Sequence, residues 1–211
     1  MKLALAPLIL AAGSVPAFAH PHVFAEARME VVVGDKGTVD ELRHVWRFDE
    51  LFSSTVLVEF DTSANLKLEP EELAEVGKVV RESLAEFDYY TSIVSNGKDV
   101  GVIGPDVIHV DFKDGQLLMF FTVRPDSAMP LDGTMSFGVY DPTMYTAIDF
   151  LNDSDLVVEG QTGSCENAVV RPDPDEVLAQ NQQSLTEAFF ENPESNDFSK
   201  FFATRLELKC A

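Results

Sequence analysis

The sequence predicts an α+β fold with a mostly antiparallel sheet, and three observations point to it. Two alternating segments, residues 23–33 and 39–48, flank a Gly-Asp-Lys-Gly turn and predict an N-terminal hairpin. Helical patterns follow at residues 49–60 and 71–87, and short strand patterns dominate after residue 90. Because the strands come in runs instead of alternating with helices, an antiparallel sheet is favoured.

The hairpin is expected to bury one face. In its first strand small and apolar residues alternate with residues such as Glu26, Arg28 and Glu30. In its second strand one face carries four large side chains, namely Leu42, His44, Trp46 and Phe48. His44 is therefore expected to be a hydrogen-bonded core histidine, with a supporting role behind a metal ligand as an alternative.

The later elements follow in order. Asp49 stands near the start of the first expected helix, and Pro70 at the first turn of the second, which makes a helix-loop-helix insertion. Strands are expected over 91–94, 107–112, 116–124, 134–140, 145–150, 156–161 and 165–170. A late helix is expected over 173–191 and a closing strand over 204–210.

The first residues are typical of a bacterial secretory signal. Lys2 precedes an apolar run, Gly13 and Pro16 interrupt it, and small residues stand at Ala17 and Ala19. The run is too short for a membrane anchor, which needs about 20 apolar residues. Residues 1–19 are therefore expected to be a signal peptide, and residues 20–211 a single periplasmic domain, because no linker divides them.

Charge and cysteine content narrow the function classes. The formal net charge is −21, which argues against nucleic acid and against anionic lipid as partners. It is compatible with cationic ligands, although solubility is the favoured explanation, because acidity alone does not identify a metal site. The two cysteines, Cys165 and Cys210, are expected to form a disulfide in an exported protein.

Cleavage after Ala19 would leave a histidine as the first residue, with a second histidine two positions later. The α-amine and ring of His20 and the ring of His22 can bind one divalent cation, and on an extended backbone both side chains point the same way. Pro21 excludes binding through its own deprotonated amide, because proline has no N–H. A frayed chain end with no metal role is the alternative.

The remaining ligands must come from elsewhere in the fold. Asp49 and Asp141 are the first oxygen candidates, and His109 is either a weaker candidate or an ordinary surface residue. Imidazole with carboxylate suits zinc, nickel, cobalt or copper(II) better than calcium or magnesium. Trp46 and Tyr145 are expected to be core aromatics, with a place in the site wall as the alternative.

A second metal candidate is the loop between the two helices. Oxygen side chains follow EF-hand spacing, at Asp61, Ser63, Asn65, Glu69 and Glu72. The sixth position, normally glycine because of the sharp turn there, is Leu66. We therefore favour a relic loop whose last glutamates begin a helix, with calcium binding as the alternative.

Several motifs in their order resemble the bacterial exported family called domain of unknown function 1007. They are His-Pro-His-Val-Phe from residue 20, Trp-Arg-Phe-Asp-Glu from 46, the calcium-type loop, Phe-Asp-Tyr-Tyr from 87, Tyr-Asp-Pro-Thr-Met-Tyr from 140, Arg-Pro-Asp-Pro from 171 and the terminal Cys210. Members are similar to periplasmic components of transition-metal transport that work with nickel/cobalt-type permeases. The resemblance implies a metal-binding accessory protein with a membrane permease as partner.

The leading hypothesis is a periplasmic protein, not an enzyme, that captures zinc, nickel or cobalt through His20 and His22 and presents it to that permease. A copper enzyme with a histidine brace is one alternative, although its second histidine usually comes from a distant part of the chain. A structural or interaction domain stabilised by calcium is the other. No hydrolase motif is present.

Overall fold

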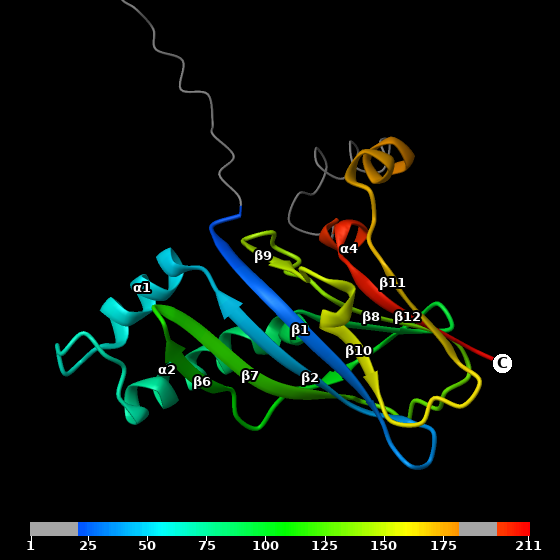
Figure 1. Ribbon diagram of the computed structural model, residues 1–211, viewed down its shortest axis with the longest axis horizontal. Helices are drawn as coiled ribbons and strands as arrows, with labels where there is room; N and C mark the ends of the chain where they lie inside the picture. Colours follow the sequence, from blue (N-terminus) through cyan, green and yellow to red (C-terminus); the bar gives the residue numbers. More distant parts are fainter. Residues whose placement is uncertain (1–20, 182–197) are drawn as a thin grey trace, which may run out of the picture.

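Alternating burial along the strands produces two sheets that pack face to face on a shared core. The computed structural model describes residues 21–181 and 198–211, so the expected signal peptide, His20 and the second half of the expected late helix lie outside the described residues. Figure 1 shows the long strands β1, β2 and β7 in front of the second sheet. The sheets are mostly antiparallel, which confirms the predicted α+β class.

The first sheet is built around the N-terminal hairpin. Its order is β10-β1-β2-β7-β5, with β6 also paired to β7 and β9 to β1. The strands are β1 (Val23–Val33), β2 (Val39–Phe48), β5 (Val102–Ile103), β6 (His109–Lys113), β7 (Gln116–Pro125), β9 (Thr146–Asp149) and β10 (Leu156–Glu159). Both β9 and β10 run parallel to β1, one after the other along the same edge.

The second sheet comes from the later part of the chain and has the order β11-β12-β8-β3-β4. Its strands are β3 (Thr91–Ser95), β4 (Lys98–Val100), β8 (Gly133–Val139), β11 (Glu166–Val170) and β12 (Arg205–Cys210). The closing strand β12 therefore lies inside the sheet, between β11 and β8. All pairings in this sheet are antiparallel.

Two helices, α1 (Glu50–Phe60) and α2 (Pro70–Leu84), cover the end of the sandwich beside β6 and β7 (Figure 1). Residues 174–181 form the described part of the predicted late helix, and α4 (Ser199–Phe202) was not predicted. The very short strands β4 and β5 were also missed, because two or three residues carry no readable alternation.

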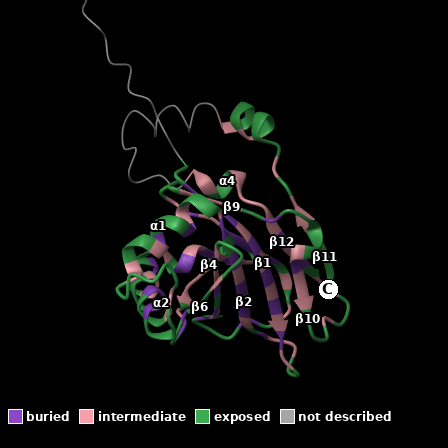
Figure 2. Ribbon diagram, turned by 60° about the vertical axis from the view of Figure 1, so that its left-hand side comes forward, coloured by how far each residue is buried: buried purple, intermediate pink, exposed green. Residues whose placement is uncertain are grey.

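The core is a continuous set of inward side chains from both sheets and from α1 and α2. Figure 2 shows buried residues alternating with partly exposed ones along β1 and β2. Trp46 and His44 are each 1% exposed, as expected of core residues. Tyr145, by contrast, is 48% exposed, so the core position expected for it is wrong: it directly precedes β9, which pairs with the start of β1.

The expected helix over residues 71–87 ends early, at Leu84, and a 3₁₀ turn, η1 (Ala85–Tyr90), follows. Its last three residues, Asp88, Tyr89 and Tyr90, have φ of 49°, 54° and 55°. Such left-handed backbone is unfavourable for residues with a Cβ. Tyr89 is nevertheless only 8% exposed, packed against Gly104, where a Cβ would collide with the tyrosine ring. Tertiary packing therefore holds this turn against its local preference.

Candidate functional site

The exposed imidazole of His22 stands where the chain enters β1. The His22 N–H donates to the Tyr145 carbonyl at 2.8 Å, and the two rings lie with centroids 5.1 Å apart. Since residues of β1 alternate in burial, His22 and Phe24 share the outer face while Val23 faces the core. The backbone therefore fixes the direction of the His22 side chain at this end of the sheet.

Asp49 lies beside the same end of β1. As the N-cap of α1, its carboxylate accepts from the Phe52 N–H and from the Phe24 N–H, both at 2.9 Å. Partial burial raises the pKa of Asp49, but these backbone donors outweigh it and lower the pKa below its ordinary value. Asp49 is thus a partly exposed carboxylate that is hydrogen-bonded to Phe24, two residues after His22. By accepting from Phe24 and Phe52 it also links β1 to α1.

Asp141 was expected to be a metal ligand, but both of its carboxylate oxygens already accept hydrogen bonds. It is 2% exposed and accepts from the Thr143 N–H at 2.7 Å, the Thr143 hydroxyl at 2.6 Å and the Thr146 N–H at 2.8 Å. Burial, followed by the neighbouring charge of Asp141, raises the pKa of Tyr90. Asp141 therefore shapes the loop that supports Tyr145, and both of its oxygens accept hydrogen bonds within that loop.

The structure does not bring His109 to this site. His109 pairs with Phe120 on β7, Phe120 pairs with Val45 on β2, and Val45 pairs with Arg28 on β1. Arg28 lies six residues after His22, which is about 20 Å along the strand, and β6 is three strands away, about 14 Å. His109 is exposed on the outer face and cannot share a metal ion with His22.

The loop between α1 and α2 is held together by hydrogen bonds among its own residues. Asp61 accepts from the N–H groups of Asn65 at 3.1 Å and Leu66 at 2.7 Å, and from the Ser63 hydroxyl at 3.1 Å. These bonds outweigh slight burial and lower the pKa of Asp61. Leu66 has φ of 61°, the left-handed conformation that explains why glycine is normal at this position.

Glu72, the last oxygen of the loop, is 8% exposed and turned inward. It accepts from the Glu69 N–H at 2.9 Å in a capping box, and from Thr62 Oγ1 at 2.7 Å and the Ser63 N–H at 3.0 Å. These donors, with the Glu69 N–H the largest contribution, lower the pKa of Glu72. Asn65 donates to Glu69 at 3.0 Å, so the candidate calcium ligands are occupied by one another and by the backbone.

The disulfide was predicted correctly. Cys165 and Cys210 are joined, with their Cα atoms 4.1 Å apart. The bridge connects the start of β11 to the end of β12, where Glu166 and Lys209 already pair. It thus ties the C-terminal strand to its edge neighbour, and a disulfide of this kind is typical of proteins outside the reducing cytoplasm.

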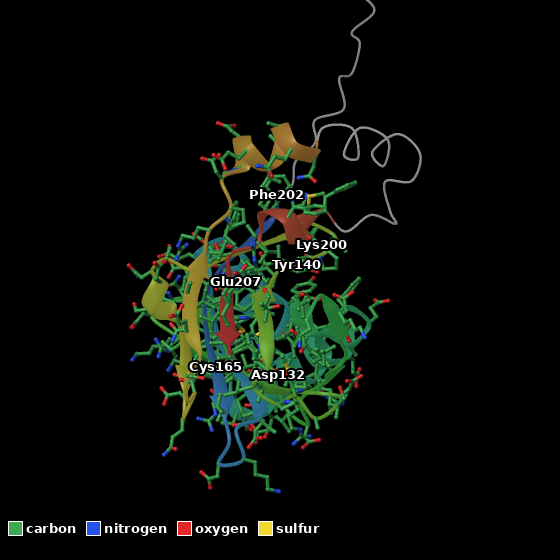
Figure 3. All side chains as sticks on the ribbon, turned by 90° about the vertical axis from the view of Figure 1, so that its right-hand side faces the viewer. Asp132, Tyr140, Cys165, Lys200, Phe202 and Glu207 are labelled. Carbon is green, nitrogen blue, oxygen red and sulfur yellow. A yellow bond between two sulfur atoms is a disulfide. The ribbon has the colours of Figure 1, made fainter. Side chains whose placement is uncertain are left out.

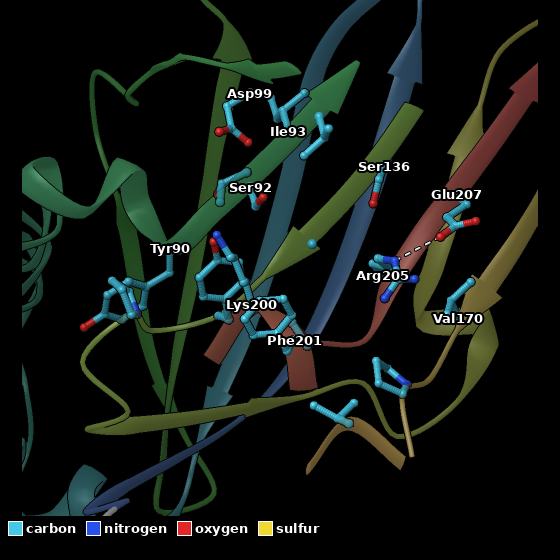
Figure 4. Close-up of a pocket in the computed structure, with 18 of the residues that line it drawn as sticks. Tyr90, Ser92, Ile93, Asp99, Ser136, Val170, Lys200, Phe201, Arg205 and Glu207 are labelled. Carbon is cyan, nitrogen blue, oxygen red and sulfur yellow. Dashed lines mark hydrogen bonds and ion pairs between the residues drawn. The ribbon is translucent and has the colours of Figure 1, made fainter. Parts of the chain in front are cut away.

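The outer face of the second sheet carries a groove of about 890 Å³ that the sequence did not reveal. Its floor comes from β3, β8 and β12, and its sides from η1, residues 173–181 and α4. Figure 3 places Lys200 and Tyr140 at one end of this sheet and Asp132 toward the other, and Figure 4 looks into the groove. The sequence feature that could have indicated the groove is the pair Ser136 and Gly138, two small residues at alternate positions of a predicted strand.

Within residues 21–181 and 198–211 no three histidine, cysteine or carboxylate side chains are grouped closely enough to hold a metal ion. A nitrogen-rich site at His22 therefore needs donors from residue 20. One exposed imidazole, with the partly exposed Asp49 nearby, fits part of such a site. Among the same residues no helix is long and apolar enough to cross a membrane.

These features define a class of protein: a disulfide-linked α+β sandwich with an exposed histidine directly before its first strand. The chain belongs to the family described as "Protein of unknown function (DUF1007)", which matches residues 5–210. It is similar to an uncharacterized protein of Haemophilus influenzae, with 24% identity over 195 residues that cover 91% of each chain. The family resemblance seen in the motifs is thus confirmed.

Proposed function

We propose that this protein is a periplasmic accessory protein that captures a divalent transition metal, zinc, nickel or cobalt, at its processed N-terminus. Copper(II) is a further possible cargo, because imidazole ligands suit it equally. The donors are the α-amine and ring of His20 and the ring of His22. The protein has no catalytic turnover and hands the metal to a membrane permease of the nickel/cobalt type.

One observation carries this proposal: His22 is exposed, and its backbone is hydrogen-bonded to the Tyr145 carbonyl just before β1, with the two rings 5.1 Å apart. An ordered backbone at the first donor lowers the entropy lost when a second donor joins it on a metal ion. Asp49, anchored to the Phe24 N–H, is the carboxylate best placed to add an oxygen or to bind a metal-bound water. The negative charge of the whole chain favours approach of cations.

Isothermal titration of zinc, nickel and copper(II) tests the proposal on protein verified by mass to begin at His20. A second preparation carries one extra N-terminal alanine, and a third carries His22→Ala. We expect both changes to weaken binding sharply, since each removes a nitrogen donor from the site. Equal binding by all three would move the site elsewhere, and no binding by any would end the proposal.

His109→Ala is the matched control, because it removes an exposed imidazole that lies far from His22. Its affinity should equal that of the unmodified protein. A loss as large as that of His22→Ala would mean that the measured metal is held by scattered surface histidines.

A further inference from the structure

The groove on the second sheet owes its shape to three neighbouring small positions. Gly138 on β8 pairs with Ser92 on β3 and with Arg205 on β12, and Ser136 follows in the next row. The outer faces of β3 and β8 therefore carry only small residues at these three positions. Figure 4 shows Ser92, Ser136 and Arg205 on the floor, with Lys200 and Phe201 coming from α4.

Gly138 is not required by the packing of this chain. Its φ is not positive, and an added Cβ would meet only the Arg205 Cβ at 3.7 Å and the Thr204 carbonyl oxygen at 3.8 Å, which are ordinary contacts. Glycine inside a strand costs stability and often marks the close approach of another chain or ligand. Here the missing side chain keeps the groove floor open.

The walls of the groove are strongly acidic. Six carboxylates line it against two cations, Lys200 and Arg205; they belong to Glu86, Asp88, Asp99, Asp173, Glu176 and Glu207. Glu207 is paired with Arg205 at 2.9 Å, whereas the other five form no ion pair within the described part of the chain. An acidic concavity in a chain of net charge −21 attracts a cationic partner and repels an anionic one.

An aromatic side chain, Tyr90, lines the groove together with Glu86 and Asp88 of the same turn. The Tyr90 ring stacks on Trp46 with centroids 6.1 Å apart and lies 6.0 Å from Phe87. Its place depends on the left-handed run from Asp88 to Tyr90, an unfavourable backbone that the surrounding contacts maintain. A fixed ring with adjacent carboxylates suits the alkyl stem and charged head of lysine or arginine.

We propose that this groove docks an extended, lysine- or arginine-rich segment of another protein. A volume of about 890 Å³ exceeds what one ion or a single side chain would fill. A second copy of this acidic chain, or a nucleic acid, would meet like charge instead. This docking surface stands independently of metal capture at His22.

A fluorescence polarisation titration tests it with the full mature chain. The probe is a labelled peptide of about ten alternating lysines and alanines, and its counterpart carries glutamate in place of lysine. We expect the lysine peptide alone to bind, with affinity that falls as salt rises. Glu86→Gln combined with Asp99→Asn should weaken binding by about tenfold, the size expected for two partly exposed charge contacts.

Two further variants separate the groove from general acidity. Glu59→Gln with Glu82→Gln removes the same charge from exposed positions on α1 and α2 and should leave affinity unchanged. Gly138→Val should fill the floor and abolish binding while the circular dichroism spectrum stays native. An equal loss of peptide affinity in the two double variants, or no binding of the lysine peptide, would overturn the proposal.

A photo-reactive benzoylphenylalanine at position 176 identifies the occupant directly, because Glu176 is an exposed residue of the groove wall and its replacement leaves the floor unfilled. A cross-link to the lysine peptide supports docking. A cross-link within the same chain, or between two copies of it, would show that the groove is already filled by this protein and would refute the proposed partner.

Discussion

His44 should make the folded protein lose stability as the pH falls below 6.5. Its side chain is 1% exposed and stacks on Phe121 with centroids 4.7 Å apart, and Nε2 lies 3.4 Å from Thr91 Oγ1. The Thr91 hydroxyl donates to the Tyr89 carbonyl at 3.1 Å, so it accepts from the imidazole Nε2–H. Nδ1 has no hydrogen-bond partner in the described structure, and no carboxylate neutralises an imidazolium there.

The sign and size of the effect follow from the pKa. Burial lowers the pKa of His44 from 6.5 to about 3. Between these values the unfolded chain binds a proton that the folded chain does not, so protons favour unfolding. From pH 7 to pH 5 this linkage costs about 2 kcal/mol of the free energy of unfolding. Carboxylates with a lowered pKa, such as Asp49 and Glu72, also make stability fall as the pH drops, but only nearer pH 4, below the range of pH 5–7 considered for His44.

The assay is urea unfolding at pH 7, 6 and 5, followed by the fluorescence of Trp46, the single tryptophan. The unmodified protein should lose about 2 kcal/mol over this range, and His44→Phe, which cannot titrate but can stack on Phe121, should lose almost none. His109→Gln, at an exposed site, should behave like the unmodified protein. A flat profile for the unmodified protein, or an unchanged slope in His44→Phe, would refute the reasoning.

Three other changes probe the scaffold. Leu66→Gly should raise the free energy of unfolding by about 1 kcal/mol in urea titrations, since it relieves left-handed backbone; calcium should leave the Tm of either form unchanged, because the loop oxygens already accept hydrogen bonds. Asp141→Asn should lower the free energy of unfolding by about 2–3 kcal/mol in the same titrations, because it places an amide donor against three donors. Asp149→Asn, at an exposed site, should change it by less than about 0.5 kcal/mol. Equal losses in the two variants would contradict the structural role of Asp141. Replacing both Cys165 and Cys210 with serine should lower the free energy of unfolding, measured by calorimetry, by about 4 kcal/mol, because the disulfide joins residues 45 positions apart. A loss under about 1 kcal/mol would contradict the chain-entropy account.

Local patterns alone determined a large part of this protein. Alternation specified β1 and β2 with the observed bounds, because one face of each strand is buried and a slip would reverse every side chain. In β2 the alternation is regular only from Leu42 onward, since a register shift against β1 interrupts it near Val39. The sequence placed Asp49 near the start of the first helix, where the structure makes it the N-cap, and two cysteines in a chain expected to be exported indicated their bridge. Each of these features depends on neighbours in sequence or on simple counting.

Tertiary structure alone decided what the candidate site residues do. Asp141 and Asp49 look alike in the sequence, yet one is buried under three donors and the other stays partly exposed beside His22. His109 is separated from His22 by strand register, which no local pattern encodes. The left-handed turn before β3 and the groove over Gly138 arise where segments far apart in the chain meet, since pairing between distant strands depends on the whole core and not on local preference.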